Sequence, residues 1–281
     1  MKISVVVTTY NRPAALTTVL RSLLAQHQLP YEILVADDGS ANETREAIQS
    51  IAKESTVPLH HLWQIDDGFR AAAARNLAVV AAQGDLIVFL DGDCVTRPDF
   101  IAQHHGLAEP GWFVAGSRVL LNPSLTEQLV DQQWPVHHWS RWQWLTQRLQ
   151  GQINRWWPLC HAPGQVWRKA QPRQWQSART CNLAVWRNDL LAVNGFDESY
   201  QGWGHEDADL AVRLIRHGVH YKNGRFSTTV LHLWHPENDR SQLPENVARL
   251  KHILGSPHTQ AVRGLDGYTP QAVSKALQAR A

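Results

Sequence analysis

The sequence predicts an α/β fold in which helices flank a mostly parallel sheet. Apolar, strand-like runs alternate with helix-like segments through residues 1–122, a pattern typical of such folds. Three of these runs end in polar residues, namely Thr8, Asp38 and Asp91. Ligands of parallel sheets bind outside the carboxyl ends of the strands, so these three side chains are expected to meet at one edge.

Each element expected in the first half rests on a local pattern. Pro13 suits the first turn of a helix, and alanine, which has the highest helix propensity, fills much of the segment 71–82. Apolar, often β-branched residues fill the expected strands. In chain order, the sequence predicts strands at 3–9, 33–36, 57–63, 86–90 and 112–121, and helices from Pro13, at 42–53, at 71–82 and from Pro98.

The run 86–95 is the stretch around which the rest is organised. Asp91 and Asp93 follow a buried strand directly, and burying two such carboxylates without compensation would cost several kcal/mol or more, roughly. A divalent cation removes that cost, and oxygen ligands suit Mg²⁺ or Mn²⁺, which also bind phosphate oxygens. The competing interpretation is a simple acidic turn after a strand.

Two arginines lie near the start of the helix expected at 71–82. A helix start favours anions, so Arg70 and Arg75 fit a site that also holds phosphate. The alternative for each is a surface ion pair with Asp66 or Asp67.

The second half continues the alternating pattern and adds a second acidic stretch. The predicted elements are a strand at 182–186, a helix at 187–193, a helix from 206 that Gly218 ends, a strand at 228–233 and tail helices at 245–254 and 270–280. Acids at a helix start stabilise it by about 0.3–1 kcal/mol each, which alone explains Glu206 and Asp207. The preceding Gly202-Trp203-Gly204 turn instead favours a carboxylate held in place as a base.

Histidines follow the last expected strand. Close to two metal-binding carboxylates, His232 or His235 is a candidate third ligand. Arg240, further along the polar tail, is a weaker candidate to close over a phosphate.

Tryptophan is concentrated in one segment. Of the 13 tryptophans, eight lie between residues 123 and 176: Trp134, Trp139, Trp142, Trp144, Trp156, Trp157, Trp167 and Trp175. We interpret the segment as an insertion with one or two short helices, and its rings as a small local core, a sugar-stacking surface or a membrane-interface surface. The sequence therefore divides into a nucleotide-binding half (1–122), the insertion (123–176), an acceptor half (177–235) and a helical tail (236–281).

Composition limits the class of protein. The formal net charge of +2 gives no argument for nucleic-acid binding, and no apolar run approaches the ~18 residues of a spanning helix. The three cysteines are far apart, and the N-terminus enters a strand at once instead of a signal peptide. We therefore expect a reducing, cytoplasmic location.

Together these stretches resemble the family-two inverting glycosyltransferases with a Rossmann-like GT-A fold. The segments VVVTTYNRP, DDGS, GFRAAAARN and Asp91-Gly92-Asp93 match the nucleotide-binding half of that family. The segment NGFDESYQGWGHEDADLAVRL is similar to the acceptor-side motif of β-1,4-galactosyltransferases and bacterial polysaccharide synthases. The resemblance covers most of residues 1–235, apart from the insertion.

The resemblance implies a role for individual residues by position. Nucleotide contacts are implied for Thr8, Tyr10, Arg12, Asp38, Arg70, Arg75 and Asp91. Metal ligands are implied at Asp93, Asp91 and either His232 or His235. Asp207 would be the base with Glu206 beside it, and sugar contacts are implied for Trp203, Gly204 and Asn182. Ala208 interrupts the family's run of acids, which leaves open which acid is the base.

The implied activity is transfer of a hexose from a UDP-sugar, with inversion and a Mn²⁺ or Mg²⁺ cofactor. The acceptor would be a hydroxyl of a growing bacterial surface glycan, of the lipopolysaccharide or capsule type. Such acceptors are often lipid-linked, so the enzyme is expected to touch the inner face of the cytoplasmic membrane peripherally.

Two other classes compete with this activity. A nucleotidyltransferase acting on sugar phosphates would normally show a Gly-rich basic loop after the first strand, which VVVTTYNRPAA lacks. A non-catalytic carbohydrate-binding protein would not need Asp91, Asp93 and Asp207 together.

Overall fold

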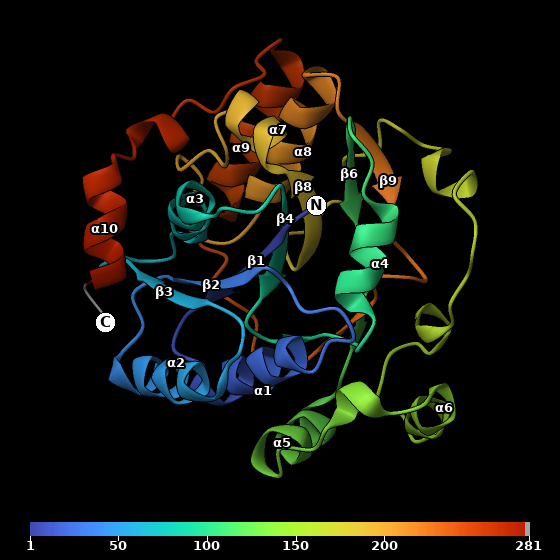
Figure 1. The fold of residues 1–281 in the computed structure, drawn as a ribbon. Helices are drawn as coiled ribbons and strands as arrows, with labels where there is room; N and C mark the ends of the chain where they lie inside the picture. Colours follow the sequence, from blue (N-terminus) through green and yellow to red (C-terminus); the bar gives the residue numbers. More distant parts are fainter. Residues whose placement is uncertain (279–281) are drawn as a thin grey trace.

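The fold is built on a mostly parallel sheet covered by helices on both faces. The computed structural model describes residues 1–278 (Figure 1). In spatial order, the seven strands of the main sheet are β3 (Leu59–Trp63), β2 (Glu32–Asp37), β1 (Ile3–Thr9), β4 (Leu86–Asp91), β8 (Asn182–Trp186), β6 (Trp112–Ala115) and β9 (His220–Asn223). Only β8 runs antiparallel to its neighbours, β4 and β6. The architecture confirms the predicted fold class.

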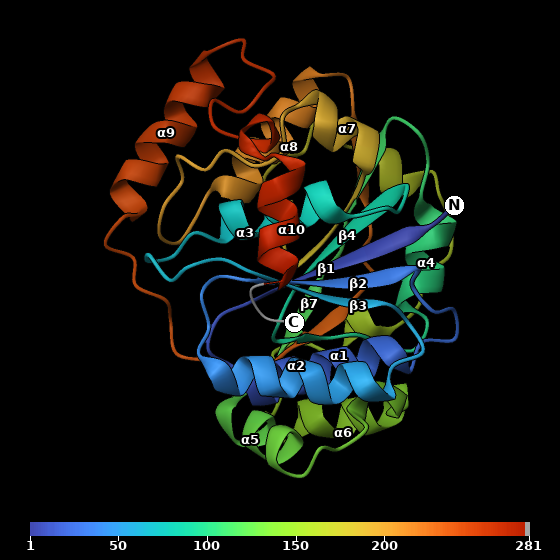
Figure 2. The same cartoon turned by 60° about the vertical axis from the view of Figure 1, so that its left-hand side comes forward.

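Alternating side chains of the strands form two apolar layers. Val5 and Val7 of β1 point into one layer and Val6 into the other, as the two-residue period of a strand requires. The first layer is covered by α1 (Pro13–Leu24), α2 (Asn42–Glu54) and α4 (Phe100–Leu107). The second is covered by α3 (Ala71–Ala81), α7 (Arg187–Ala192), α8 (Glu206–Arg216) and α10 (Pro270–Gln278). Figure 2 shows the α1–α2 pair and α3 on opposite faces of the sheet.

A second, three-stranded sheet brings distant segments together. It has the order β5 (Cys94–Val95), β10 (Val230–His232) and β7 (Arg118–Leu120). β10 pairs antiparallel with β5, and His232 lies directly opposite Cys94. The small sheet thus places the last strand of the chain beside the Asp91–Asp93 stretch.

The expected strand at 112–121 is wrong in one respect. The segment forms two short strands, β6 and β7, that belong to different sheets. The chain leaves the main sheet at Gly116 and Ser117, where Gly116 donates to the Asn182 carbonyl and Ser117 accepts from Val230. The strand β9 was not predicted because its sequence, HYKN, has no apolar run.

Other boundaries differ from the predictions by a few residues. The helix expected from Pro98 begins at Phe100, and the helix expected at 245–254 is α9 (Leu243–Gly255). Of the helix predicted at 270–280, the part to Gln278 is α10, and residues 279–280 lie outside the described residues. No helix within 1–278 is both long enough and apolar enough to cross a bilayer.

The tryptophan-rich segment contains two α-helices, α5 (Pro123–Asp131) and α6 (Arg141–Leu149), and short 3₁₀ turns. Trp144 is buried in the main core, and the Trp139 ring packs on it with centroids 4.9 Å apart. Trp134 and Trp156 also pack against this core. The local-core interpretation therefore applies to these rings, whereas Trp142 and Trp157 are exposed.

Candidate active site

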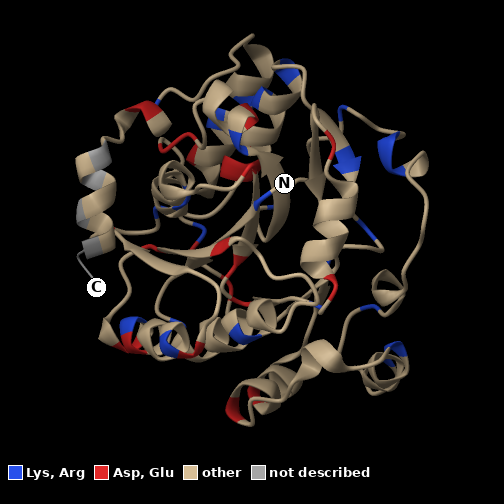
Figure 3. Ribbon diagram, viewed as in Figure 1, with Lys and Arg blue, Asp and Glu red and all other residues tan. Residues whose placement is uncertain are grey.

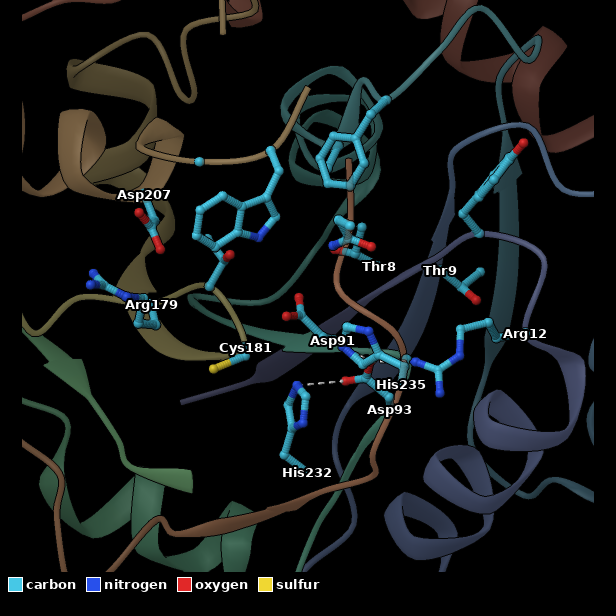
Figure 4. Close-up of a pocket in the computed structure, with 18 of the residues that line it drawn as sticks. Thr8, Thr9, Arg12, Asp91, Asp93, Arg179, Cys181, Asp207, His232 and His235 are labelled. Carbon is cyan, nitrogen blue, oxygen red and sulfur yellow. Dashed lines mark hydrogen bonds and ion pairs between the residues drawn. The ribbon is translucent and has the colours of Figure 1, made fainter. Parts of the chain in front are cut away.

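A cavity of about 550 Å³ opens at the carboxyl ends of β1 and β4. Thr8, Asp38 and Asp91 all line it, so the three strand ends meet as their positions predicted. The other predicted residues that line it are Tyr10, Arg12, Arg75, Asp93, Trp203, Gly204, Glu206, Asp207, His232 and His235. Figure 4 shows that the labelled side chains come from segments far apart in the sequence. No residue of the segment 123–176 lines this cavity.

Two predicted residues do not line the cavity. The Asn182 side chain is buried; its Oδ1 accepts from His104 Nε2, and its Nδ2 donates to the carbonyls of Ser117 and Thr228. These hydrogen bonds use the Asn182 amide to link the two sheets, so the cavity lining gives no support to the sugar contact, which stays a prediction.

The second of these is Arg70. Its guanidinium donates to the Ile65 carbonyl and faces Asp67 at 3.8 Å, so it fastens its own loop. The structure thus shows the local ion pair with Asp67, and the nucleotide contact of Arg70 stays a prediction.

Arg75 is the cation that links the acids of the site. It is almost fully buried, and its Nε donates to Thr8 Oγ1 at 3.0 Å. One terminal nitrogen donates to Glu206 Oε1 at 3.0 Å and the other to Asp91 Oδ1 at 3.3 Å. Arg75 thereby joins the ends of β1 and β4 to the start of α8.

The turn before α8 needs its glycines. Gly202 and Gly204 have φ values of +71° and +110°, which residues with a Cβ rarely adopt. A Cβ on Gly202 would also lie 2.7 Å from the Gln242 Cβ. His205 then caps the helix at φ +77°. This turn presents Trp203 and the first acids of α8 to the cavity.

The three acids at the start of α8 differ in what they contact. Glu206 is held by Arg75, as described above. Asp209 is fully buried and paired with Arg213 at 2.6 Å, which makes it structural. The Asp207 carboxylate accepts only the Ala208 N–H, through Oδ1 at 2.7 Å, among the interactions of the described residues. Asp207 is therefore the acid of the three that is free to take a proton in the cavity.

The surroundings of Asp207 change its acidity. Burial raises the pKa of Asp207 to about 7, and the Glu206 charge adds to this increase, whereas Arg179 and Arg75 oppose it. Figure 4 shows Arg179 next to Asp207. A carboxylate with a pKa near neutrality is suited to general-base catalysis, because it is deprotonated yet basic enough to accept a proton.

Asp93 lies between two histidines and an arginine. Its Oδ1 is 3.5 Å from His232 Nε2, and its Oδ2 is 3.4 Å from His235 Nε2. Arg12 donates to Oδ2 at 2.7 Å. The structure brings both candidate histidines to the carboxylate at nearly equal distances, so geometry does not choose between them.

The donors around Asp93 fit a divalent cation. His235 Nδ1 donates to the Pro236 carbonyl in the neutral tautomer, which leaves the lone pair of Nε2 facing Asp93. Burial lowers the pKa of His232, which also favours a neutral imidazole. A cation held between the Asp93 carboxylate and the Nε2 atoms of the two histidines would offset the negative charge of that carboxylate. Asp91 lies two residues away and lines the same cavity.

The nucleotide side of the cavity carries Asp38 and Tyr10. Asp38 is buried, and its carboxylate accepts the Arg70 backbone N–H at 2.7 Å and the Gln64 side chain. Tyr10 is 47% exposed and donates to Asp66 at 3.0 Å. Asp38 thus orders the loop that leads into α3, and Tyr10 offers an open ring face.

Several lining residues were not predicted from the sequence. Arg118 donates to the Cys181 sulfur at 3.2 Å, and Arg179 lies three residues before β8. Both arginines lie next to short or irregular stretches of the chain, where no sequence motif indicated a functional role. Arg240, by contrast, was singled out, and it lies 5.0 Å above the Trp203 ring.

With this geometry in view, comparison with known proteins identifies the family. The profile described as "Glycosyl transferase family 2" matches residues 4–169, which is more than half of the chain. The chain belongs to glycosyl transferase family 2. A second profile, described as "N-terminal domain of galactosyltransferase", matches residues 167–236 and so includes the turn and acids of α8.

Curated relatives of this family 2 glycosyltransferase support the assignment. Validoxylamine A glucosyltransferase from Streptomyces hygroscopicus subsp. limoneus is 32% identical over 231 residues, which cover 77% of this chain and 48% of the relative. Hyaluronan synthase from Pasteurella multocida is 27% identical over 235 residues, which cover 78% of this chain and 23% of the synthase. The chain thus spans about half or less of the length of these relatives.

A solved structure with the same fold is the mannosyltransferase PcManGT from Pyrobaculum calidifontis, in complex with GDP-Man and Mn²⁺. It superposes with a TM-score of 0.59 at 17% identity, covering 99% of this chain and 70% of the other. At this level of identity, the similarity supports the glycosyltransferase fold alone.

Proposed function

We propose that this family 2 glycosyltransferase is an inverting, metal-dependent enzyme that moves a hexose from a UDP-sugar to a sugar hydroxyl. One observation carries the proposal. An unpaired carboxylate oxygen of Asp207 and the Asp93 carboxylate, flanked by two imidazoles, line the same cavity. A base and a diphosphate-binding centre are the two parts that such a reaction needs on opposite sides of the anomeric carbon.

In the proposed reaction, Asp207 removes the proton of the acceptor hydroxyl while its oxygen attacks the anomeric carbon. The bond between that carbon and the diphosphate breaks, and the diphosphate leaves with the electron pair. Attack on the face opposite the leaving group inverts the anomeric configuration. Arg75 holds Glu206 and Asp91 in place throughout. Glu206 is proposed to contact a sugar at the reaction centre.

The donor nucleotide is proposed to lie between β1 and β2. Tyr10 offers an exposed ring on which a base can stack, and Thr8 and Asp38 lie at the two strand ends. Arg12 is proposed to contact the diphosphate, beside the Asp93 carboxylate that it already binds. Uracil is the base that the family resemblance implies, whereas PcManGT forms a complex with GDP-Man.

Asp93, Asp91 and His232 or His235 would hold a divalent cation, Mn²⁺ or Mg²⁺. When bound, the cation acts as a Lewis acid that stabilises the departing diphosphate. The Mn²⁺ named with PcManGT supports this assignment by analogy.

The acceptor is proposed to enter over Trp203 and Gly204. The Trp203 ring is partly exposed and presents a face on which a sugar can stack, with the Arg240 guanidinium on the ring as well. We propose a growing bacterial surface glycan as the acceptor. The names of the relatives, a glucosyltransferase and a polysaccharide synthase, support this class of substrate.

The pH dependence of turnover should report Asp207. Because the base acts in its deprotonated form and its pKa is raised to about 7, kcat is expected to be low at pH 5.5 and to rise through neutrality, roughly. Stopped assays that measure kcat for nucleotide release from about pH 5 to about pH 9 check this prediction. A kcat that does not change with pH would contradict the role of Asp207 as the base.

Peripheral contact with an anionic membrane is a further part of the proposal. Residues 132–188 carry eight Lys and Arg and no acid, and their first part runs along one side of the molecule (Figure 3). Trp142, Trp157 and Trp167 are exposed within it. Aromatic rings and cations together suit a membrane interface on the cytoplasmic side.

Vesicle sedimentation tests this contact. The chain is expected to pellet with phosphatidylglycerol-containing vesicles and much less with phosphatidylcholine alone, and Trp142→Ser should weaken binding because this ring is 62% exposed. Equal recovery in the supernatant with both vesicle types would remove membrane contact from the proposal.

The activity itself is tested with a panel of nucleotide-sugars, assayed for release of the nucleoside diphosphate with and without EDTA. Release of UDP that EDTA stops is expected. Release of pyrophosphate from a nucleoside triphosphate and a sugar phosphate would identify a nucleotidyltransferase instead. Sugar binding with no turnover of any donor would indicate a carbohydrate-binding protein.

A further inference from the structure

The cation site has a further possible donor that the proposed function does not use. Cys94 follows Asp93 and is fully buried. Its Sγ lies 3.5 Å from Asp93 Oδ1, the same oxygen that lies 3.5 Å from His232 Nε2. One ligand atom from each of Asp93, Cys94 and His232 lies within 4.8 Å of the other two.

The pairing of β5 and β10 explains why these atoms converge. Cys94 and His232 are directly opposite each other on antiparallel strands. Residues in this relation project to the same face with their Cβ atoms about 4.5–5.5 Å apart. The backbone therefore places the two Cβ atoms side by side, so the sulfur and the imidazole project from neighbouring positions on one face.

The two distances from Asp93 Oδ1 are close to those between the ligands of a tetrahedral metal site. Zinc lies about 2.3 Å from a thiolate sulfur and about 2.0–2.1 Å from nitrogen or oxygen ligands, so two ligand atoms of such a site are about 3.3–3.6 Å apart. Both distances from Asp93 Oδ1 fall within this interval. Three protein ligands leave a fourth position for water or a diphosphate oxygen, as in catalytic zinc sites.

We infer that Cys94 is a ligand of the cation site and gives it affinity for thiophilic divalent cations such as Zn²⁺ and Co²⁺. This rests on the metal site of the proposed function and adds a sulfur to it. On binding, the Cys94 thiol loses its proton to solvent and the thiolate bonds to the cation. Soft sulfur ligands favour Zn²⁺ over Mg²⁺, so Zn²⁺ should bind more tightly at this site.

Cobalt spectroscopy of the full chain tests the inference. The chain is freed of metal with a chelator, dialysed and titrated with Co²⁺. A thiolate-to-cobalt charge-transfer band in the near ultraviolet is expected, saturating at one Co²⁺ per chain. The band should disappear in Cys94→Ser and persist in Cys160→Ser, the matched control, because Cys160 belongs neither to the Asp93–Cys94–His232 cluster nor to the cavity lining. Absence of the band in the wild type would overturn the inference.

The neighbouring Cys181 must be distinguished from Cys94, because it lines the cavity. The chain has three cysteines, so the double variant Cys160→Ser/Cys181→Ser leaves Cys94 as the only thiol. X-ray absorption of this variant loaded with Zn²⁺ should show a sulfur scatterer at about 2.3 Å. Only nitrogen and oxygen scatterers would overturn the inference, even if Cys94→Ser failed to fold.

These readouts separate the inference from the proposed function. They report metal ligation and not turnover, so a sulfur ligand would be detected even if the chain transferred no sugar. Conversely, a site with only oxygen and nitrogen ligands would leave the glycosyltransferase proposal intact.

Discussion

Replacing Asp207 with Asn is expected to lower kcat for sugar transfer by roughly 10²–10⁴-fold, the usual contribution of a general base. The amide is nearly isosteric with the carboxylate but cannot accept the hydroxyl proton. Of the three acids at the start of α8, Asp207 is the one that neither Arg75 nor Arg213 binds directly. The Kd of the donor should not change, since Asp207 lies on the acceptor side in the proposed reaction.

The measurement pairs steady-state kinetics with calorimetric titration of UDP. Glu245→Gln is the matched control: it removes an exposed acid from the first turn of α9, outside the cavity. This control isolates the effect of losing an acid at a helix start, about 0.3–1 kcal/mol of helix stability, from the loss of a base. Wild-type turnover in Asp207→Asn would contradict the assignment of Asp207 as the base. Glu206 would then be the next candidate for the base.

Replacing Asp93 with Ala is expected to abolish the metal-dependent part of nucleotide binding. Asp93 is the carboxylate that both histidines face, so its loss removes the centre of the proposed site. Because loss of even a supporting residue costs about 10–100-fold in metal affinity, loss of this ligand should cost at least ~100-fold. The Kd for UDP in the variant with Mn²⁺ should then equal that of the wild type in EDTA.

Calorimetry with and without Mn²⁺ checks this equality. Asp67→Ala is the control, because Asp67 is an exposed loop acid whose carboxylate only faces Arg70 at 3.8 Å. Circular dichroism should confirm that the Asp93→Ala chain is folded, since Arg12 loses its counter-charge and both histidines lose the carboxylate that they face. Undiminished, Mn²⁺-dependent binding in a folded variant would place the cation elsewhere.

The sequence alone could predict that the residues at the strand ends lie close together, because this follows from the geometry of parallel sheets. Parallel strands end at the same edge, so Thr8, Asp38 and Asp91 had to meet. The positive φ values at Gly202 and Gly204 were likewise foreseeable, because a glycine pair around a tryptophan indicates an unusual turn.

Other residues depended on geometry that local patterns do not contain. Arg70 and Arg75 looked alike in the sequence, but Ala71 and Arg75 are four apart on α3 and share the face that lines the cavity, whereas Arg70 precedes the helix. The position of Asn182 in the sequence was compatible with a sugar contact. In the structure, its side-chain amide instead makes hydrogen bonds at the junction of the two sheets. Cys94 was indistinguishable from a core residue because its partner, His232, lies on a strand of three residues far along the chain.

A crystal structure of the chain with UDP and Mn²⁺, with the metal located by its anomalous scattering, tests the central claim most directly. We expect one Mn²⁺ bonded to Asp93, to a histidine and to the diphosphate, with Asp207 facing the position of the anomeric carbon. Mn²⁺ and diphosphate bound outside this cavity, or a donor whose sugar end points away from Asp207, would contradict it.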